Sequence, residues 1–340
     1  MSTSRTREKA DKLTYTQAEV TAGDTAARAG RKNLIINGAM QVAQRGTSST
    51  GNGYVSLDRW YSNQSGASTT FSQETNTNPS ETGGIKSYAR LNVSSSSDYT
   101  GISQKIEDVT SVPSGTVTLS FWAKGTAPVG GLYVNSAQDF GTGGSGDVDI
   151  AGILITSSLT SSWVKYSTQI TIPSVDGKTI GAGSFFNLAI NQGTNSSSTA
   201  YDLNITGVQL ETGSVATDFE HRSYGEELSL CQRYYQVYGG TAYATIASGF
   251  QPNSTNAKFH LSYMQEMRAV PSIGTANSAE LIVTDRTGFD QPLAGFGGHV
   301  AGKTSAYISV TMSAVGAQDA GLLLAVKNGT TATVNLNAEL

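Results

Sequence analysis

Apolar and polar residues alternate in several short segments of this chain, and such alternation favours β-strands with one buried face. In residues 115–124, Val117, Leu119 and Phe121 all fall on the same face. Further segments of this kind cover residues 87–93, 163–173, 185–190 and 203–210. Loops rich in Gly, Ser, Thr and Asn separate the segments, and these residues supply turn geometry. The sequence therefore predicts a β-sandwich over residues 33–222, opened by an apolar strand at residues 34–36 and a turn at Asn37-Gly38.

A second β-rich unit is predicted over residues 239–340. Its strand candidates are residues 258–264, 281–283, 306–312, 322–327 and 331–336. Asn328-Gly329 lies between the last two and predicts a hairpin turn that pairs them. The overall expectation is an all-β chain with two sandwich domains.

The pattern changes period between the two units. Ser223 is followed three residues later by Glu226, the spacing of a capping box at a helix start. Apolar residues then recur every three or four positions, at Leu228, Cys231, Tyr234, Tyr235 and Tyr238. Gly239-Gly240 is a suitable helix end. The sequence thus predicts a connector helix over residues 223–238, with its apolar stripe packed on a domain or on copies of itself.

Charge is sparse and unevenly distributed. Only 14% of the residues are charged and the net charge is −4, which argues against nucleic-acid binding. Residues 1–32 are instead basic, and their Lys and Arg residues are Arg5, Arg7, Lys9, Lys12, Arg28, Arg31 and Lys32. A basic leader on an acidic body predicts an attachment segment that docks onto an acidic partner; a solvated tail is the alternative.

The chain carries no signal for export or membrane insertion. Its N-terminus lacks the apolar stretch of a secretory signal, and no run approaches the ~18 apolar residues of a membrane span. Its single cysteine, Cys231, allows no intrachain disulfide. We expect a protein made in the cytoplasm that leaves the cell by lysis or within a particle.

Several motifs resemble bacteriophage tail-fibre proteins. They lie at residues 33–46, 58–60, 102–107, 119–124, 207–211, 216–220, 230–235 and 267–273. The closing motif, Gly-Val-Gln-Leu-Glu followed by Leu-Cys-Gln-Arg-Tyr-Tyr, is the most specific. The resemblance implies a jelly roll like that of carbohydrate-binding modules, carried by a tail fibre or related virion appendage.

The resemblance also implies how such a protein is organised and what it contacts. Its N-terminus would attach to other tail or adaptor proteins, and its C-terminal domain would reach host polysaccharide or lipopolysaccharide. Homotrimers are common among such appendages. A purely structural virion protein, a polysaccharide depolymerase and a free bacterial lectin are the alternatives.

Aromatic side chains are the candidate ligand contacts, because sugar binders stack pyranose rings on them and add a few polar contacts. The candidates are Trp122, Tyr243, Phe289, Phe296, His299 and Tyr307. Trp122 lies opposite the apolar face of its strand, whereas Phe289, Phe296 and His299 belong to a distal loop region that we expect to form the recognition surface. Trp60 and Trp163 are further candidates, and core packing is the alternative for every tryptophan.

Catalytic and metal-binding patterns are weak. Asp139, Asp147 and Asp149 cluster in a Gly-rich loop that could hold calcium or supply a carboxylate pair, but their spacing matches no EF-hand. The three histidines, His221, His260 and His299, are not at metal-ligand spacing, and no nucleophile motif is present. The sequence therefore predicts a non-enzymatic protein without a cofactor or a metal.

Overall fold

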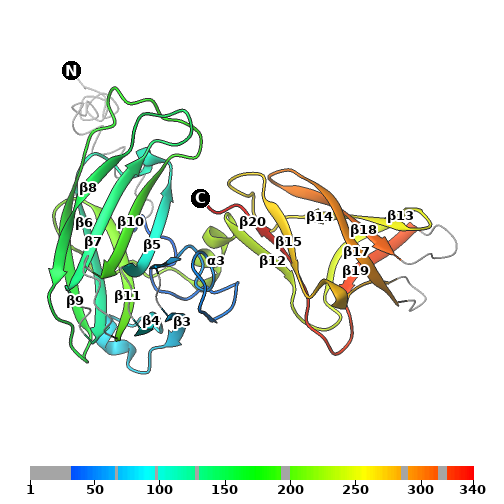
Figure 1. Cartoon of the computed structure of the whole chain (residues 1–340), viewed down its shortest axis with the longest axis horizontal. Helices are drawn as coiled ribbons and strands as arrows, with labels where there is room; N and C mark the ends of the chain where they lie inside the picture. Colours follow the sequence, from blue (N-terminus) through cyan, green and yellow to red (C-terminus); the bar gives the residue numbers. More distant parts are fainter. Residues whose placement is uncertain are drawn as a thin grey trace, which may run out of the picture.

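The computed structural model describes residues 32–65, 68–95, 99–126, 130–192, 200–284, 290–312 and 320–340. Within them the chain forms two β units, with one short α-helix, α3, between the two (Figure 1). Three single 3₁₀ turns lie at Pro79–Thr82, Val109–Ser111 and Ser278–Glu280. The predicted all-β fold is confirmed.

The first unit is an antiparallel sandwich of two sheets. One sheet has the order β1 (Ser48–Ser49), β3 (Ser68–Thr75), β4 (Ser87–Ser95), β11 (Tyr201–Thr212), β6 (Gly115–Gly125) and β9 (Val164–Ile172). The other has the order β2 (Tyr61–Ser65), β5 (Tyr99–Glu107), β10 (Phe185–Gln192), β7 (Leu132–Asp139) and β8 (Val148–Thr156). The orders β4-β11-β6-β9 and β5-β10-β7-β8 are those of a jelly roll.

The alternating residues form the core of this sandwich. Val117, Leu119 and Phe121 are fully buried, as the period-2 pattern predicts. Trp60 is also fully buried, and its indole N–H donates to the carbonyl of Asn37 at 3.0 Å. Trp60 is therefore a core residue and not a ligand contact.

The opening segment differs from the prediction, because residues 33–36 form no strand. They run beside β11, where the Leu34 amide donates to the Leu210 carbonyl at 2.9 Å. The Asn33 side chain donates to the Val208 carbonyl at 3.0 Å and accepts from the Leu210 amide at 3.1 Å. The Asn33 side chain thus makes the hydrogen bonds that the backbone of a paired strand would make. Such side-chain-to-backbone hydrogen bonds compete with sheet formation.

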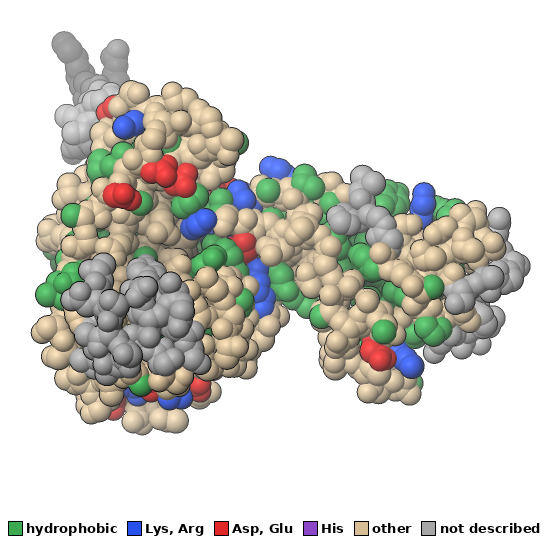
Figure 2. All heavy atoms as spheres, in the orientation of Figure 1, with side chains coloured by type: hydrophobic (Ala, Val, Ile, Leu, Met, Phe, Trp, Pro, Cys, Tyr) green, Lys and Arg blue, Asp and Glu red, His purple; other side chains and the backbone are tan. Residues whose placement is uncertain are grey.

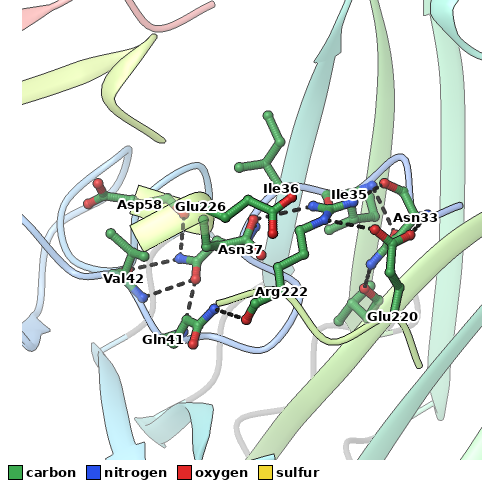
Figure 3. Close-up of polar contacts among 12 residues, drawn as sticks. Asn33, Ile35, Ile36, Asn37, Gln41, Val42, Asp58, Glu220, Arg222 and Glu226 are labelled. Atoms are coloured by element: carbon green, nitrogen blue, oxygen red, sulfur yellow. Dashed lines mark hydrogen bonds and ion pairs between the residues drawn. The ribbon is translucent and has the colours of Figure 1, made fainter. Parts of the chain in front are cut away.

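Two polar residues fix this opening segment in place (Figure 3). The Asn37 side chain accepts from the amides of Gln41 and Val42, at 2.9 and 3.0 Å, and closes the predicted turn. Arg222 donates to the carbonyls of Asn33 and Ile35. The segment is therefore held by hydrogen bonds to β11 on one side and to Arg222, just before α3, on the other.

Helix α3 spans Tyr224–Gln232 and is shorter than predicted. Its predicted start is confirmed, since the Ser223 hydroxyl accepts from the Glu226 amide at 3.2 Å. The continuation to residue 238 is wrong: Tyr234 follows the helix, and Tyr235 and Tyr238 lie in β12 (Tyr235–Gly239). The sequence Tyr-Gln-Val-Tyr at residues 235–238 is compatible with both a two-residue and a helical period. It forms a strand because it pairs with β20 (Thr333–Asn337).

The second unit is a closed barrel with a small sheet beside it, whereas the sequence predicts a sandwich. The barrel order is β13 (Thr245–Asn253), β14 (Asn256–Ser262), β18 (Ser305–Met312), β17 (Asp290–Ala301), β16 (Leu281–Thr284) and β19 (Ala320–Val326). The small sheet has the order β12, β20 and β15 (Ser272–Ala276). Closure pairs the barrel edges that a sandwich would leave open.

The predicted β19–β20 hairpin is also wrong. Gly329 has a φ of +73°, and the Thr330 amide donates to the Lys327 carbonyl, so a turn does form at Asn328-Gly329. However, β20 pairs with β12 and β15, and β19 pairs with β13 and β16. The turn therefore carries the chain out of the barrel and into the small sheet.

Buried charges join the two units where the C-terminus returns to α3 (Figure 1). Glu339 accepts from both Arg59 and Arg45 of the jelly roll. The two guanidinium carbons lie 3.5 Å from the ring centres of Tyr234 and Tyr235, respectively. We call Arg45, Arg59, Tyr234, Tyr235 and Glu339 the junction cluster.

Candidate ligand-binding face

Trp122 lies on the outer face of the six-stranded sheet. Since Val117, Leu119 and Phe121 point into the core, Trp122 and Lys124 point away from it. Trp122 is half-buried and lies opposite Thr206 of β11 and Lys165 of β9. The prediction that Trp122 faces away from the core is confirmed.

A bulge in β11 makes room for the Trp122 indole. The β11–β6 register shifts between Thr206 and Gln209, and Gly207 inside the shift has a φ of +63°. A Cβ on Gly207 would lie 3.0 Å from Cδ1 of Trp122 and 2.7 Å from Cδ1 of Ile85. Glycine is therefore required both for the backbone conformation and for close approach of the ring.

Two more aromatic rings surround Lys124 on the same face. Its ammonium lies 4.7 Å from the ring centre of Trp163 and 5.5 Å from that of Tyr88. Tyr88 and Trp163 meet edge to face, with ring centres 5.4 Å apart. Trp163 is buried, whereas Tyr88 is half-buried. These contacts hold the ammonium by cation–π attraction.

Polar side chains extend the face across β11 to β4. Lys124 lies opposite Asn204, and Asn204 lies opposite Arg90. The Arg90 guanidinium makes a two-pronged ion pair with Asp202, through Nε at 2.9 Å and Nη2 at 3.0 Å. That hydrogen-bonded pair raises the pKa of Arg90 against the opposing effect of burial, so the group stays charged.

A shallow groove of about 350 Å³ begins at Arg90. Strands β3 and β4 line it with hydroxyl and amide groups, including Thr70, Ser72 and Asn92. We call Tyr88, Arg90, Trp122, Lys124 and this groove the Trp122 face. Aromatic surface for stacking thus adjoins hydrogen-bonding groups, a combination that suits sugar rings.

The distal candidates lie on the second unit and are only partly brought together. Tyr307 is exposed on β18, and its ring lies 5.6 Å from that of His260 on β14. Tyr243 is exposed between β12 and β13. The predicted loop position is wrong for Phe296 and His299, because both lie in β17, where pairing with β18 fixes the backbone. Phe296 is partly buried and packs against the barrel core, so packing accounts for it. Phe289 and the side chain of His299 lie outside the described residues.

The predicted attachment residues are described only at Lys32, whose ammonium donates to the Asp218 carbonyl at 2.6 Å. The other six, Arg5, Arg7, Lys9, Lys12, Arg28 and Arg31, lie outside the described residues. Of the acidic loop, Asp139 accepts from the Gly141 amide at 2.8 Å. In the described part of the chain, no three His, Cys, Asp or Glu side chains come together as a metal site.

Over the same described ranges, no helix is long and apolar enough to cross a membrane. The visible surface is mostly uncharged and polar, with isolated Lys, Arg, Asp and Glu side chains (Figure 2). This agrees with the low charged fraction of the sequence.

Sequence reasoning singled out Trp122 but not its neighbours. The alternation in residues 87–93 does place Tyr88 and Arg90 on the face opposite Ala89 and Leu91. It gives no sign that β4 lies one strand away from β6. That fact depends on the sheet order, in which β11 pairs with both.

Comparison with known proteins shows similarity to solved structures, but no match by sequence. No protein-family profile matches the sequence, and no curated protein matches it. A protein from Bacteroides thetaiotaomicron to which sugar binding has been assigned without a demonstrated ligand is similar in structure, with 12% identity and a TM-score of 0.38, covering 54% of this chain and 100% of its own.

Two carbohydrate-binding modules are also similar in structure. One, solved with β-1,4-galactotriose, has 12% identity and a TM-score of 0.30, covering 53% of this chain and 97% of its own. The other is a cellulose-binding domain of a Cellulomonas fimi glucanase, with 15% identity and a TM-score of 0.30, covering 52% and 100%. The chain is thus similar to jelly-roll modules that occur in carbohydrate-binding proteins.

Proposed function

We propose that this protein is a non-catalytic virion appendage of the bacteriophage tail-fibre type that binds a host cell-surface glycan. The observation that carries glycan binding is the Trp122 face: Tyr88 lies opposite Glu74, which lines a groove of hydroxyl and amide groups, and Trp122 lies on the same face of the sheet, two strands from Tyr88. Stacking supplies contact area and the polar groups supply orientation. Polysaccharide or lipopolysaccharide of the host is the expected partner.

The assignment to a virion is supported by the sequence. The tail-fibre resemblance covers residues 33–273, and the basic segment 1–32 would attach to tail or adaptor proteins. A single sugar site of this open kind binds weakly. Assembly as a homotrimer, with several fibres on each particle, would raise the avidity by effective concentration without new contacts.

Glycan binding is tested by applying labelled full-length protein to an array of bacterial surface oligosaccharides. Replacing Trp122 with Ala removes the stacking surface, so we expect binding to fall at least tenfold. Tyr307→Ala is the matched control, because it removes an exposed aromatic ring from the second unit. Loss of binding in the control and not in Trp122→Ala would move the site to the barrel. No binding by folded wild-type protein would reject the proposal.

Attachment is tested separately. A chain that lacks residues 1–31 should still bind the same oligosaccharides, because the Trp122 face lies within the jelly roll. It should no longer be incorporated into particles when it replaces the full-length protein during infection. Normal incorporation would contradict the assigned role of this segment.

A purely structural virion protein is the second candidate, and the junction cluster favours it. Arg59 and Glu339 are almost completely buried and fix the two units to each other. A rigid link of this kind suits a spacer, whose two ends must keep a fixed orientation. Absence of array binding, together with presence in purified particles, would favour this candidate.

A further inference from the structure

We propose that the Trp122 face selects acidic saccharides, and that Lys124 binds the carboxylate of a uronic or ulosonic acid residue. This inference rests on the proposed glycan binding and deepens it by naming the ligand class. It starts from the one feature of the face that sugar stacking does not require, a partly buried ammonium held among aromatic rings.

Lys124 has no acidic partner among the described residues. Its ammonium contacts the rings of Tyr88 and Trp163 and lies in no ion pair with a described carboxylate. Arg90, on the same face, is instead neutralised by both carboxylate oxygens of Asp202. The cation–π contacts orient the Lys124 ammonium but leave its charge uncompensated. A carboxylate on the bound ligand would compensate the charge of the Lys124 ammonium.

The other charged groups on this face are held by contacts within the protein. Lys165, opposite Trp122, adds a second cation, and its ammonium donates to the Thr217 carbonyl at 3.1 Å. Of the nearby acids, Asp202 is already paired with Arg90, Glu74 accepts from the Ser72 hydroxyl at 2.7 Å, and Glu211 accepts from Thr217. These charges are balanced in number, so the anion site depends on Lys124 alone, which has no carboxylate partner among the described residues. Charge complementarity thus favours an anionic sugar over a neutral one.

The sheet register fits a ligand of more than one sugar unit. Arg90, Asn204 and Lys124 lie directly opposite one another on three adjacent strands, which spans roughly 10 Å at about 4.8 Å per strand. The groove continues from Arg90 over β3. A saccharide crossing the strands would place one ring at Trp122 with its carboxylate at Lys124, and its next units over Asn204 and the groove.

The test uses full-length protein and matched pairs of oligosaccharides, each an acidic sugar chain beside its carboxyl-reduced neutral counterpart. An α-1,4-linked galacturonate oligomer and the galactose oligomer made from it by reduction form one such pair. The acidic member should bind at least tenfold more tightly. Its binding should weaken as the salt concentration rises, because the contact is ionic and partly exposed.

Lys124→Gln should abolish this preference and its salt dependence, so that the acidic and neutral members of each pair bind with equal affinity. Lys124→Arg should preserve the preference, since the positive charge remains. Lys303→Gln, at an exposed position of the second unit, is the matched control and should change nothing.

The outcomes separate this inference from the proposed function. Equal binding of acidic and neutral partners, unchanged in Lys124→Gln, would overturn the acidic preference and leave glycan binding intact. A preference that survives Lys124→Gln would also overturn it, because another group would then carry the charge contact. No binding to any member of any pair would reject the proposed function itself.

Discussion

Replacing Glu339 with Gln tests whether buried charge holds the two units together. Glu339 accepts from Arg59 and Arg45, whose side chains are 1% and 7% exposed. Arg45 keeps a second carboxylate, Asp58, at 3.8 Å. Arg59 keeps the Lys105 carbonyl and the rings of Tyr234 and Tyr54, but no second carboxylate among the described residues. The cost of the substitution should therefore come mainly from Arg59.

The expected magnitude follows from this burial. Burial alone would lower the pKa of Arg59, but Glu339, Tyr234, Tyr54 and Cys231 together outweigh that effect, and Glu339 contributes most among them, so the pKa lies above its usual value. Breaking a buried pair typically costs about 3–5 kcal/mol, because one charge stays behind unpaired. Gln can still accept one hydrogen bond from the guanidinium. We therefore expect the free energy of unfolding to fall by about 3 kcal/mol, the lower end of that range.

The unfolding of the jelly roll in urea can be measured separately from that of the second unit, because all three tryptophans lie in the jelly roll. Tryptophan fluorescence then reports the jelly roll, and far-UV circular dichroism reports both units. Wild-type transitions should coincide, whereas in Glu339→Gln they should separate and the fluorescence midpoint should fall. The control is Glu266→Gln, an exposed carboxylate whose loss should cost less than about 0.5 kcal/mol. Coincident transitions and a similarly small change in Glu339→Gln would refute the reasoning.

Three further predictions concern single residues. Burial raises the pKa of Asp58 to about 6, so the folded state holds this proton more tightly than the unfolded state, and stability should fall by about 3 kcal/mol between pH 3 and pH 7. Urea titrations at several pH values should show this slope in wild type and not in Asp58→Asn; equal slopes would contradict it. Gly207→Ala should cost about 1–2 kcal/mol in thermal unfolding and weaken glycan binding, because it strains the bulge and displaces the Trp122 indole. Ser223→Ala removes the α3 cap and should cost about 1 kcal/mol, with an unchanged melting temperature as the contrary result.

The strands were predictable where alternation is local. The sequence of residues 115–124 and 203–210 predicts β6 and β11, because the side chains that face the core are apolar and those on the other face are mostly polar, which leaves a two-residue period. The end of α3 was not predictable in this way. Tyr234, Tyr235 and Tyr238 satisfy two periods at once, and only the distant strand β20 decides between them.

The opening segment and the candidate site needed knowledge of tertiary contacts. Asn33 replaces strand pairing with side-chain hydrogen bonds to residues about 175 positions away, which no local pattern encodes. The direction of Trp122 could be predicted from alternation. Its grouping with Tyr88 could not, because β4 and β6 meet only through β11.

The most direct test of the Trp122 face is a crystal structure of the full chain with the oligosaccharide that binds it best. We expect electron density for a sugar ring over Trp122, with a carboxylate near Lys124 and further units over Asn204. Density at Tyr307 and His260 on the barrel, with the Trp122 face empty, would contradict the central claim.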